Sequence, residues 1–385
     1  MNLAAEPVPV VLAGVHGHGR SHLDNLRRLS DDGLVRLVGV CDRLPVPDSA
    51  LEGLGQVQRS TELGDLLART GASITILVTP IHTHLPLART ALAHGSHLLL
   101  EKPTTSTMAE FDELTAAVDA SGLACQVGFQ SLGSTAVDAV RGLVADGAIG
   151  EVRGIGGAGT WIRTSSYYER AAWAGRRRMD GRDVVDGALT NPFAHAVATA
   201  LAVAGADRSV SGDIELELFH AHDIESDDTS CVRLHAPDGT PITVAVTLCA
   251  AEHRAPRLTV HGSAGRIVLE YTLDRVTLER PGREPVTTTH PRTDLLENLV
   301  AHLRGGEPLL VPPARTRGFM TVLDAVRRAP DPAPVPEWAQ DVSTQDDGVH
   351  RVIRGVEDLV HRSAEHMALF SEIGVPWAPA AKVTP

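Results

Sequence analysis

The sequence predicts an α/β protein: a doubly wound parallel sheet, followed by a second α/β domain with a large, mostly antiparallel, open-faced sheet. Three observations support this fold class. The chain has 385 residues, which is more than one hydrophobic core usually supports. In its first third, short apolar segments alternate with segments of helical periodicity, as in parallel sheets covered on both faces. After residue 150, longer β-branched segments follow one another through short turns, which favours antiparallel pairing.

The first domain is expected over residues 1–128. Its expected strands cover residues 8–13, 34–41, 73–78, 98–100 and 125–128. After the first strand and a glycine-rich turn, Leu23, Leu26 and Leu29 recur at helical spacing. Further helices are expected from a Ser60 cap to residue 69, and over residues 86–94 and 108–121. Strands and helices that alternate at this interval form a doubly wound sheet.

The second domain is expected over residues 129–330. A helix over residues 134–146 precedes expected strands at 152–163, 214–220, 229–234, 242–248, 257–260, 267–269 and 276–278. Helices near residues 189–203 and 294–303 would cover one face of this sheet. The other face would remain open, so we expect a homodimer or homotetramer that buries it.

The last segment, residues 331–385, is expected to pack back on the body of the protein. The Pro-rich stretch 329–336 indicates a linker or an exposed loop. Beyond it we expect one amphipathic helix with an apolar stripe, formed by Val349, Val352, Val356, Leu359, Val360, Ala364 and Met367.

Composition and charge limit the kinds of partner. The formal net charge of -13 at pH 7 argues against nucleic acid or an anionic membrane, because both require a basic surface. The cysteines form no CxxC pair and indicate buried thiols in a reducing compartment; they are Cys41, Cys125, Cys231 and Cys249. The histidines show no ligand spacing with nearby acids or cysteines, so no metal site is expected. The N-terminal apolar run is too short to span a bilayer and lacks a basic region, so we expect a cytoplasmic protein.

The turn after the first strand has the pattern of a dinucleotide-binding loop. It reads Gly14-x-His16-x-x-Gly19, with His16 at the usual position of the second glycine. Gly17 can take over the role of that glycine, and His18 lies in the same loop. Such a turn would bring backbone N–H groups and a helix N-terminus against a pyrophosphate.

An acid follows the second strand, as nucleotide binding requires. Asp42 would accept hydrogen bonds from the adenosine ribose and would repel a 2'-phosphate, which favours NAD. Arg43 keeps NADP possible, because it can pair with a 2'-phosphate or stack on adenine. The alternative is a tight loop in which Asp42 only caps a turn.

Lys102 stands out because the chain otherwise uses arginine. Of the 35 basic residues only Lys102 and Lys382 are lysines, and Lys382 lies in a Pro/Ala-rich tail. An ammonium group can shift its pKa and transfer a proton, whereas a guanidinium is always protonated. Lys102 is therefore a catalytic candidate; the alternative is a surface lysine that follows a buried strand.

These motifs together resemble the glucose-fructose oxidoreductase and inositol dehydrogenase (Gfo/Idh/MocA) family over nearly the whole chain. The matching segments are Thr79-Pro80 with His84, Glu101-Lys102-Pro103, Gln126 to Gln130, and Asp186 to His195. The sequence departs from the family pattern at three positions: His16 replaces glycine, Ile81 replaces asparagine, and Asn191 replaces aspartate.

The resemblance implies a Rossmann domain, an open-sheet α/β domain, and oxidation or reduction of a sugar or cyclitol hydroxyl with a bound nicotinamide cofactor. It implies further cofactor contacts from Thr79, Pro80, His84, Glu101, Lys102 and Gln130. His195 becomes the candidate general base, with Asn191 four residues earlier on the same helical face. Lys102 would donate a hydrogen bond to the substrate oxygen as charge develops. Because asparagine supplies no charge, we expect a less basic His195, or a proton that passes mainly through Lys102. A hydrogen-bonded core histidine is the alternative for His195.

Aromatic residues gather shortly before Asn191, in a chain with few of them. The cluster consists of Trp161, Arg163, Tyr167, Tyr168 and Trp173. Aromatic faces with an arginine suit a sugar ring, so these residues and Asn191 are candidates for substrate binding. An oligomer contact or a loop packed on itself explains the cluster equally well.

We therefore expect an NAD-dependent dehydrogenase or reductase that acts on a CH–OH group of a sugar, glycoside or cyclitol. Two alternatives stay open. A non-redox lyase or glycoside-cleaving enzyme would reduce and reoxidise tightly bound NAD within each turnover, so that no net NADH accumulates. A non-catalytic sugar- or nucleotide-sensing regulatory protein would still bind the cofactor after the substitution Lys102→Ala.

Overall fold

The structure, a computed structural model, describes residues 6–378. It divides into a first unit, Met1–Phe129 with Thr293–Ala314, and a second unit, Gln130–Arg292 with Arg315–Pro385. Lys382 lies outside the described residues. Within residues 6–378, no helix combines the length and the apolarity that crossing a membrane requires.

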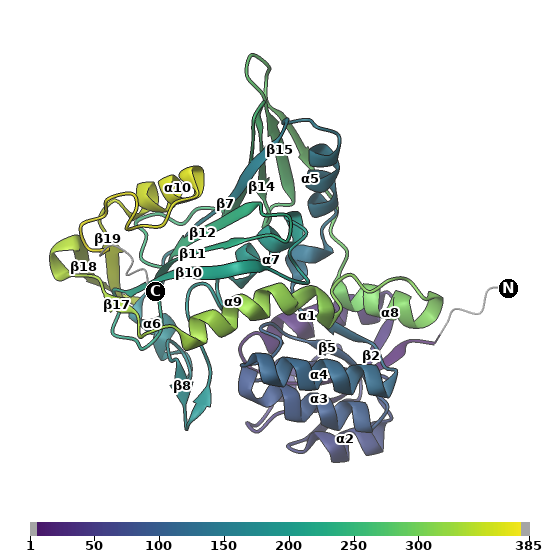
Figure 1. Cartoon of the computed structure of the whole chain (residues 1–385). Coiled ribbons are helices and arrows are strands. Elements are labelled where there is room, and N and C mark those ends of the chain that lie inside the picture. Colours follow the sequence, from purple (N-terminus) through teal and green to yellow (C-terminus); the bar gives the residue numbers. More distant parts are fainter. Residues whose placement is uncertain (1–5, 379–385) are drawn as a thin grey trace. The chain divides into compact units, whose positions relative to one another are not determined.

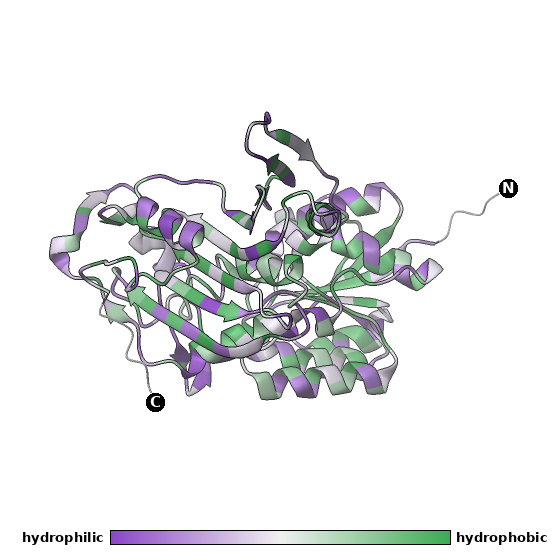
Figure 2. Ribbon diagram, turned by 45° about the horizontal axis from the view of Figure 1, so that its top comes forward, coloured by the Kyte–Doolittle hydropathy of each residue, from purple (hydrophilic) through white to green (hydrophobic). Residues whose placement is uncertain are grey.

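The first unit is built on a parallel sheet, as predicted (Figure 1). It has six strands in the order β3-β2-β1-β4-β5-β6, of which β3 was not expected. The strands are β1 (Val8–Ala13), β2 (Val35–Cys41), β3 (Gln58–Ser60), β4 (Ile74–Leu77), β5 (His97–Leu100) and β6 (Cys125–Val127). They are mostly apolar, because helices cover both faces of the sheet (Figure 2). The strand order reverses between β1 and β4, and ligands of such sheets bind beyond the carboxyl ends of the strands at this point.

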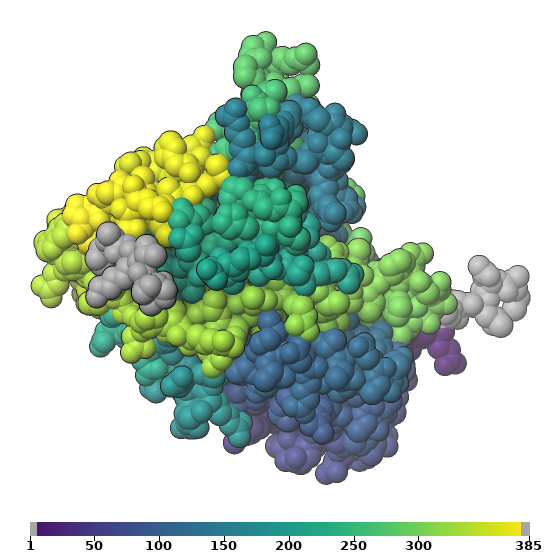
Figure 3. Space-filling model, in the orientation of Figure 1, coloured from purple at the N-terminus to yellow at the C-terminus, as the bar shows by residue number. Residues whose placement is uncertain are grey.

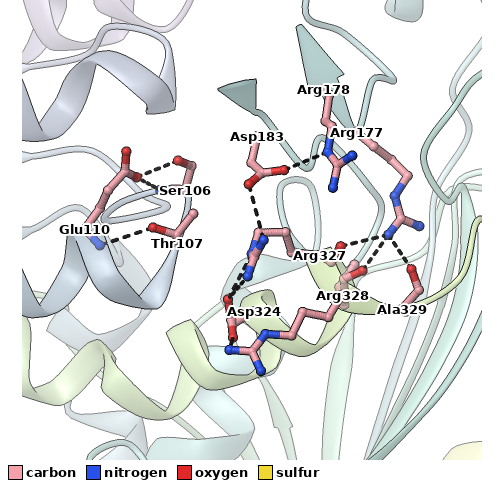
Figure 4. Close-up of polar contacts among 11 residues, drawn as sticks. Ser106, Thr107, Glu110, Arg177, Arg178, Asp183, Asp324, Arg327, Arg328 and Ala329 are labelled. Carbon is pink, nitrogen blue, oxygen red and sulfur yellow. Dashed lines mark hydrogen bonds and ion pairs between the residues drawn. The ribbon is translucent and has the colours of Figure 1, made fainter. Parts of the chain in front are cut away.

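The helices of the first unit are α1 (Gly19–Asp31), α2 (Leu63–Thr70), α3 (His84–Ala93), α4 (Met108–Ser121) and α8 (Leu295–Gly305). α4 has the predicted bounds because both of its ends are capped. Thr107 accepts a hydrogen bond from the backbone N–H of Glu110 at 3.1 Å, and Gly122 takes the left-handed C-cap conformation. The carboxylate of Glu110 in turn accepts hydrogen bonds from Ser106 (Figure 4).

Two helices of the first unit do not begin at the expected residues. α2 begins at Leu63, because Ser60 is the last residue of β3 and pairs with Cys41 of β2. α3 begins at His84, two residues before Pro86. A proline fits the first turn of a helix, since its missing N–H would have no partner there.

The segment 293–314, which includes α8, belongs to the first unit, whereas the sequence placed it in the second domain. Side-chain hydrogen bonds explain the difference. The amide of Gln126 in β6 donates to Asn298 of α8 at 2.5 Å and accepts from the N–H of Val311 at 2.8 Å. Asn25 of α1 donates to Asp294, the N-cap residue of α8, at 3.0 Å. These partners lie more than 160 residues apart in the chain, so local patterns do not reveal them.

The second unit is built on a nine-stranded sheet in the order β16-β15-β14-β13-β7-β12-β11-β10-β17 (Figure 1). The strands are β7 (Val152–Thr160), β10 (Ser211–His220), β11 (Thr229–His235), β12 (Pro241–Thr247), β13 (Arg257–Gly262), β14 (Arg266–Glu270), β15 (Arg275–Glu279), β16 (Val286–Thr289) and β17 (Ala333–Pro334). Only the pairs β7–β12 and β10–β17 are parallel, so the sheet is mostly antiparallel, as predicted. β17 lies in the Pro-rich stretch that was expected to be a linker or loop, and it forms an edge strand, where proline is tolerated.

Helices cover one face of this sheet. They are α5 (Ala136–Ala145), α7 (Ala194–Val203) and α9 (Arg317–Arg328). α7 packs on β7, β12 and β13, α5 on β14 and β15, and α9 on β10. The sequence analysis missed α9, although Phe319, Val322, Leu323 and Val326 recur at helical spacing and are buried.

The end of the chain covers part of the other face of the sheet. This C-terminal cap consists of β18 (Gln340–Gln345), β19 (Gly348–Ile353), α10 (Val356–His366) and the residues up to 378. The prediction of one amphipathic helix starting near Val349 was wrong, because the turn Asp346-Asp347 joins β18 and β19 into a hairpin. Figure 3 shows the C-terminal segment in yellow at the surface of the second unit. α10 packs on β7 and β12. Beyond it, the ring of Trp377 packs against Phe219 of β10 with centroids 4.9 Å apart.

The C-terminal cap weakens the argument for a homodimer or homotetramer. That prediction assumed an open face, and the cap buries apolar residues of β10, β11 and β12 on this face. On β14 and β15 the same side carries the ion pairs Arg266–Glu279 and Arg275–Glu270, and Arg266 also reaches Glu365 of α10. Because these strands are polar there, no large apolar face of the described sheet requires a partner, and the oligomeric state stays a prediction.

Candidate functional site

The glycine turn after β1 is shaped for close approach of a ligand to the backbone. Gly14 has a φ of +89°, and a Cβ atom there would lie 2.5 Å from the carbonyl oxygen of Val78. A Cβ atom at Gly19, the first residue of α1, would lie 2.1 Å from the carbonyl oxygen of Gly14. Gly17 also has a positive φ, +62°. The turn therefore requires these glycines, as the dinucleotide-binding pattern predicts.

His16 occupies the usual position of a glycine in this turn. Its Nε2 atom is buried and has no hydrogen-bond partner among the described residues. A buried polar atom without a partner costs free energy, so a ligand with a hydrogen-bonding group would fit beside it. The turn thus fits a dinucleotide, and His16 can add a contact that glycine lacks.

Asp42 lies beyond the carboxyl end of β2 and orders the neighbouring loops. Its Oδ2 accepts a hydrogen bond from the N–H of Val15 at 2.7 Å, and its Oδ1 accepts one from the N–H of Leu44 at 2.9 Å. Each carboxylate oxygen has two lone pairs, so both can still accept a ribose hydroxyl. Arg43 is exposed beside it.

Glu101 of the Glu-Lys-Pro motif is 5% exposed and faces α1. Its Oε1 accepts a hydrogen bond from His22 Nε2 at 2.9 Å and lies 3.5 Å from His18 Nε2. Burial by itself raises the pKa of Glu101, but the contacts with His18 and His22 outweigh it and hold the pKa well below its usual range. The contact with Glu101 in turn raises the pKa of His18. Glu101 Oε2 accepts from the N–H of Lys102 at 3.1 Å, which makes Glu101 a positioning residue for half-buried Lys102.

His84 is 1% exposed and connects two loops at the carboxyl ends of β4 and β5. Its Nε2 lies 2.8 Å from the carbonyl oxygen of Thr79, and its Nδ1 lies 3.0 Å from that of Pro103. Burial lowers the pKa of His84, so it is neutral near pH 7. The buried ring holds the Thr79-Pro80 loop against the loop after β5, and its contact with a cofactor stays a prediction.

In the second unit, Asn191 precedes α7 in a turn and does not share a helix with His195. α7 begins at Ala194, because residues 187–193 form turns, with Asn191 N–H bonded to the carbonyl oxygen of Gly187 at 3.0 Å. The predicted same-face arrangement on one helix was therefore wrong. The amide of Asn191 donates to Asp186 at 2.6 Å, and buried Asp186 also accepts from Gly175 N–H at 2.8 Å.

The His195 ring contacts Ser131, a residue that the sequence analysis missed. His195 Nδ1 lies 3.3 Å from Ser131 Oγ, which lies 2.9 Å from Thr199 Oγ1. The Thr199 hydroxyl donates its one proton to the carbonyl oxygen of His195 at 2.6 Å. Ser131 follows Gln130 in a 3-10 turn of the second unit, so its position after the Gln126–Gln130 motif was the available signal. If Nδ1–H donates to Ser131, Nε2 carries the lone pair that a general base needs.

The aromatic cluster is largely packed on itself. The Trp161 ring packs against Phe193 and stacks on His253, with centroids 4.4 Å and 5.4 Å away. The Arg163 guanidinium lies 5.2 Å from the centre of the Trp161 ring. In the same way, the guanidinium of Arg170 lies over Tyr167 and Trp173. The structure therefore favours the self-packed interpretation for these ring faces.

Arginine–aspartate pairs hold the segment that leads to Asn191. The short hairpin β8 (Arg178–Met179) and β9 (Arg182–Asp183) precedes it. Arg177 donates to the carbonyl oxygens of residues 326, 327 and 329 at the C-terminus of α9 (Figure 4). A cation is favourable there, because the C-terminus of a helix carries partial negative charge. Asp183 pairs with Arg178 and Arg327, so the hairpin and α9 are joined.

Two clusters of possible metal ligands correct the expectation that the histidines have no acid or cysteine nearby. His18, His22 and Glu101 form one cluster in the first unit. His222, Asp228 and Cys249 form the other, in the second unit. Histidine spacing did not reveal them, because the fold brings their partners from other segments.

Comparison with protein families gives two matches. Residues 8–129 match the model of the oxidoreductase family with an NAD-binding Rossmann fold. Residues 137–268 match the GFO/IDH/MocA C-terminal domain. The two matches together cover more than half of the chain.

Characterised and uncharacterised relatives share parts of the sequence. The dTDP-3,4-didehydro-2,6-dideoxy-alpha-D-glucose 3-reductase of Streptomyces antibioticus is 35% identical over 95 residues, 25% of this chain and 29% of that protein. The uncharacterised oxidoreductase YdgJ of Escherichia coli is 28% identical over 202 residues, 52% of this chain and 54% of that protein. The chain therefore spans between about a third and about half of the length of these relatives.

Solved structures share the fold over most of the chain. The WlbA dehydrogenase of Bordetella pertussis, in complex with NADH and UDP-GlcNAcA, has a TM-score of 0.69 at 20% identity and covers 86% of this chain and 100% of that one. The UDP-N-acetylglucosamine 3-dehydrogenase GnnA of Acidithiobacillus ferrooxidans has a TM-score of 0.65 at 17% identity, with 84% and 97% covered. At these sequence identities the similarity shows a shared fold alone.

Proposed function

We propose, because the chain belongs to the GFO/IDH/MocA oxidoreductase family with its NAD-binding Rossmann fold, that it oxidises or reduces a sugar, glycoside or cyclitol at a CH–OH or keto carbon. The observation that carries the proposal is the Glu101–Lys102 pair at the end of β5, in a domain whose glycine turn fits a dinucleotide. Lys102 is the only lysine among the described residues, so no neighbouring ammonium substitutes for it.

The residues of the first unit would hold the cofactor. When bound, NAD supplies the nicotinamide that accepts or gives the hydride. The backbone from Gly14 to Gly19 and the N-terminus of α1 would bind its pyrophosphate, and Asp42 would accept hydrogen bonds from its ribose. Lys102 would donate a hydrogen bond to the substrate oxygen, which stabilises negative charge that develops there during oxidation.

The residues of the second unit would bind and deprotonate the substrate. His195 would accept the hydroxyl proton at Nε2, with Nδ1–H directed to Ser131. Asn191, held by Asp186, would orient a neighbouring hydroxyl through its amide oxygen. The dTDP-sugar reductase and the UDP-GlcNAcA complex among the relatives lead us to include sugars linked to a nucleoside diphosphate among the proposed substrates.

Turnover with a substrate panel tests the proposal. Purified protein is mixed with NAD⁺ and free sugars, inositols, glycosides, and UDP- or dTDP-sugars, and NADH absorbance and product masses are followed. Lys102→Arg keeps the positive charge but not the compact ammonium, and it should retain NADH binding while losing most turnover. Product without net NADH would support the redox-neutral alternative. Cofactor binding without turnover of any panel member would support the sensor alternative and overturn the proposal.

A further inference from the structure

Three buried side chains of different chemistry meet in the second unit, outside the residues assigned to the reaction. His222 follows β10, Asp228 immediately precedes β11, and Cys249 lies two residues after the end of β12. Their exposed fractions are 3%, 0% and 1%. A ring nitrogen, a carboxylate oxygen and the sulfur all lie within 4.8 Å of one another. Nitrogen, oxygen and sulfur ligands together are typical of zinc.

The imidazole and the carboxylate are already oriented. His222 Nε2 lies 3.1 Å from the carbonyl oxygen of Arg163, which can only accept, so Nε2 carries the proton and Nδ1 has the free lone pair. Metal-binding histidines are usually held in this way. Burial lowers the pKa of His222, which keeps the ring neutral and able to ligate. Asp228 Oδ2 accepts from the N–H groups of Ala221 and His222, both at 2.8 Å.

The Cys249 thiol is protonated, whereas metal binding requires the thiolate. Burial and the neighbouring Asp228 carboxylate raise the pKa of Cys249 well above its usual range, so the thiol stays protonated in the bare protein. A bound dication would reverse this preference, because it stabilises the thiolate directly. One carboxylate and one thiolate would also balance the two charges of the ion.

Tyr168 gives an independent observation at the same place. Its ring packs against His222 with centroids 5.0 Å apart. Its hydroxyl group is buried and has no hydrogen-bond partner among the described residues. A hydroxyl in this environment fits beside a metal-bound water molecule, to which it can donate.

We propose that His222, Asp228 and Cys249 bind one zinc ion, with a water molecule beside Tyr168 as the fourth ligand. Tetrahedral zinc with bonds of about 2.0–2.3 Å places its ligand atoms about 3.3–3.7 Å apart, so the three groups move together by up to about 1.5 Å. Binding is not a redox step: the Cys249 thiol loses its proton to solvent and its sulfur bonds to Zn²⁺. The ion would join the segments that follow β10 and β12 to the start of β11, and two of its ligands contact the segment of the aromatic cluster, since Cys249 pairs with Ile162 and His222 bonds the Arg163 carbonyl oxygen.

Metal content and cobalt spectroscopy test this proposal. Tag-free protein is produced in medium supplemented with Zn²⁺ or Co²⁺, so that the buried site can be loaded during folding, and metals are measured by mass spectrometry. We expect one zinc per chain, and a thiolate-to-cobalt charge-transfer band in the cobalt form. Cys249→Ser and His222→Asn should each lose the band and at least about tenfold in affinity. Cys231→Ser is the matched control, because Cys231 is also buried but belongs to no such ligand cluster among residues 6–378.

Wild-type protein decides the question even if a variant fails to fold. Folded wild-type protein with less than 0.1 equivalents of zinc, roughly background, and no thiolate band would overturn the proposal and leave a hydrogen-bonded cluster. A metal that remains in Cys249→Ser but is lost in His22→Gln would place it at the cluster of the first unit, and would also overturn it.

Discussion

The buried pair between Glu101 and His22 gives the sharpest prediction about the first unit. Glu101→Gln keeps the shape of the side chain but removes the charge, and its single carbonyl oxygen can accept either from His22 or from the N–H of Lys102. A hydrogen bond to a charged group contributes about 1.5–3 kcal/mol, against about 0.5–1.5 kcal/mol for a neutral one. We therefore expect the free energy of unfolding of the first unit to fall by about 1–2 kcal/mol.

The effect should depend on pH in a defined window. The folded-state pKa of Glu101 is depressed, so its contribution is present above the unfolded pKa of about 4.3 and is lost as the pH falls through the folded value. The pKa of His18 is raised, so its contribution is complete below about pH 6.5 and is lost as the pH rises through the folded value. The difference between wild-type protein and Glu101→Gln should therefore be largest between about pH 4.5 and 6.5.

Hydrogen exchange is the suitable assay, because tryptophan fluorescence does not report on the first unit. All four tryptophans, Trp161, Trp173, Trp338 and Trp377, belong to the second unit. Peptides that cover α1 and β5 report the opening free energy of the Glu101 contact directly. Glu113→Gln, which breaks the exposed ion pair with Arg89 on the same unit, is the matched control and should change stability by less than about 1 kcal/mol.

A difference between wild-type protein and Glu101→Gln that is constant from pH 4 to 8 would refute this reasoning, because it would mean that Glu101 is not charged in the folded state. A loss no larger than that of Glu113→Gln would refute it as well. In that case the contacts of His18 and His22 would be as weak as those at the surface.

Three further predictions concern packing, cofactor binding and catalysis. Gly156→Ala should lower the urea midpoint followed by tryptophan fluorescence, at a cost of about 1–3 kcal/mol, because its Cβ would lie 1.8 Å from the Ala364 carbonyl oxygen. Gly142→Ala, at an exposed position of α5, should instead raise the free energy of unfolding by about 0.5–1 kcal/mol. Asp42→Asn should weaken NADH binding in a fluorescence titration by about tenfold, since the neutral amide is a poorer acceptor for ribose hydroxyls, and unchanged affinity would contradict the assigned role. His195→Gln should reduce kcat by about 10²- to 10⁴-fold with the Kd for NADH unchanged, and a parallel loss of NADH binding would indicate a structural role instead.

Features that depend on neighbouring residues could be predicted from the sequence. The apolar runs and their spacing predicted both sheets, since burial on two faces or on one face imposes a period on the chain. The bounds of α4 followed from its caps, which Thr107 and Gly122 provide within a few residues of the helix. The glycine turn followed in the same way, because the positive φ of Gly14 is a local requirement.

Contacts between distant segments could not be predicted and are known from the folded structure alone. The helix α8 belongs to the first unit because of its hydrogen bond with Gln126. The C-terminal cap packs on the second sheet through aromatic residues near the end of the chain. His195 contacts Ser131, 64 residues away, and Cys249 meets His222 through the pairing of separate strands. Periodicity and capping act over a few residues, whereas these contacts depend on how whole elements pack, so their positions in the chain carry no local pattern.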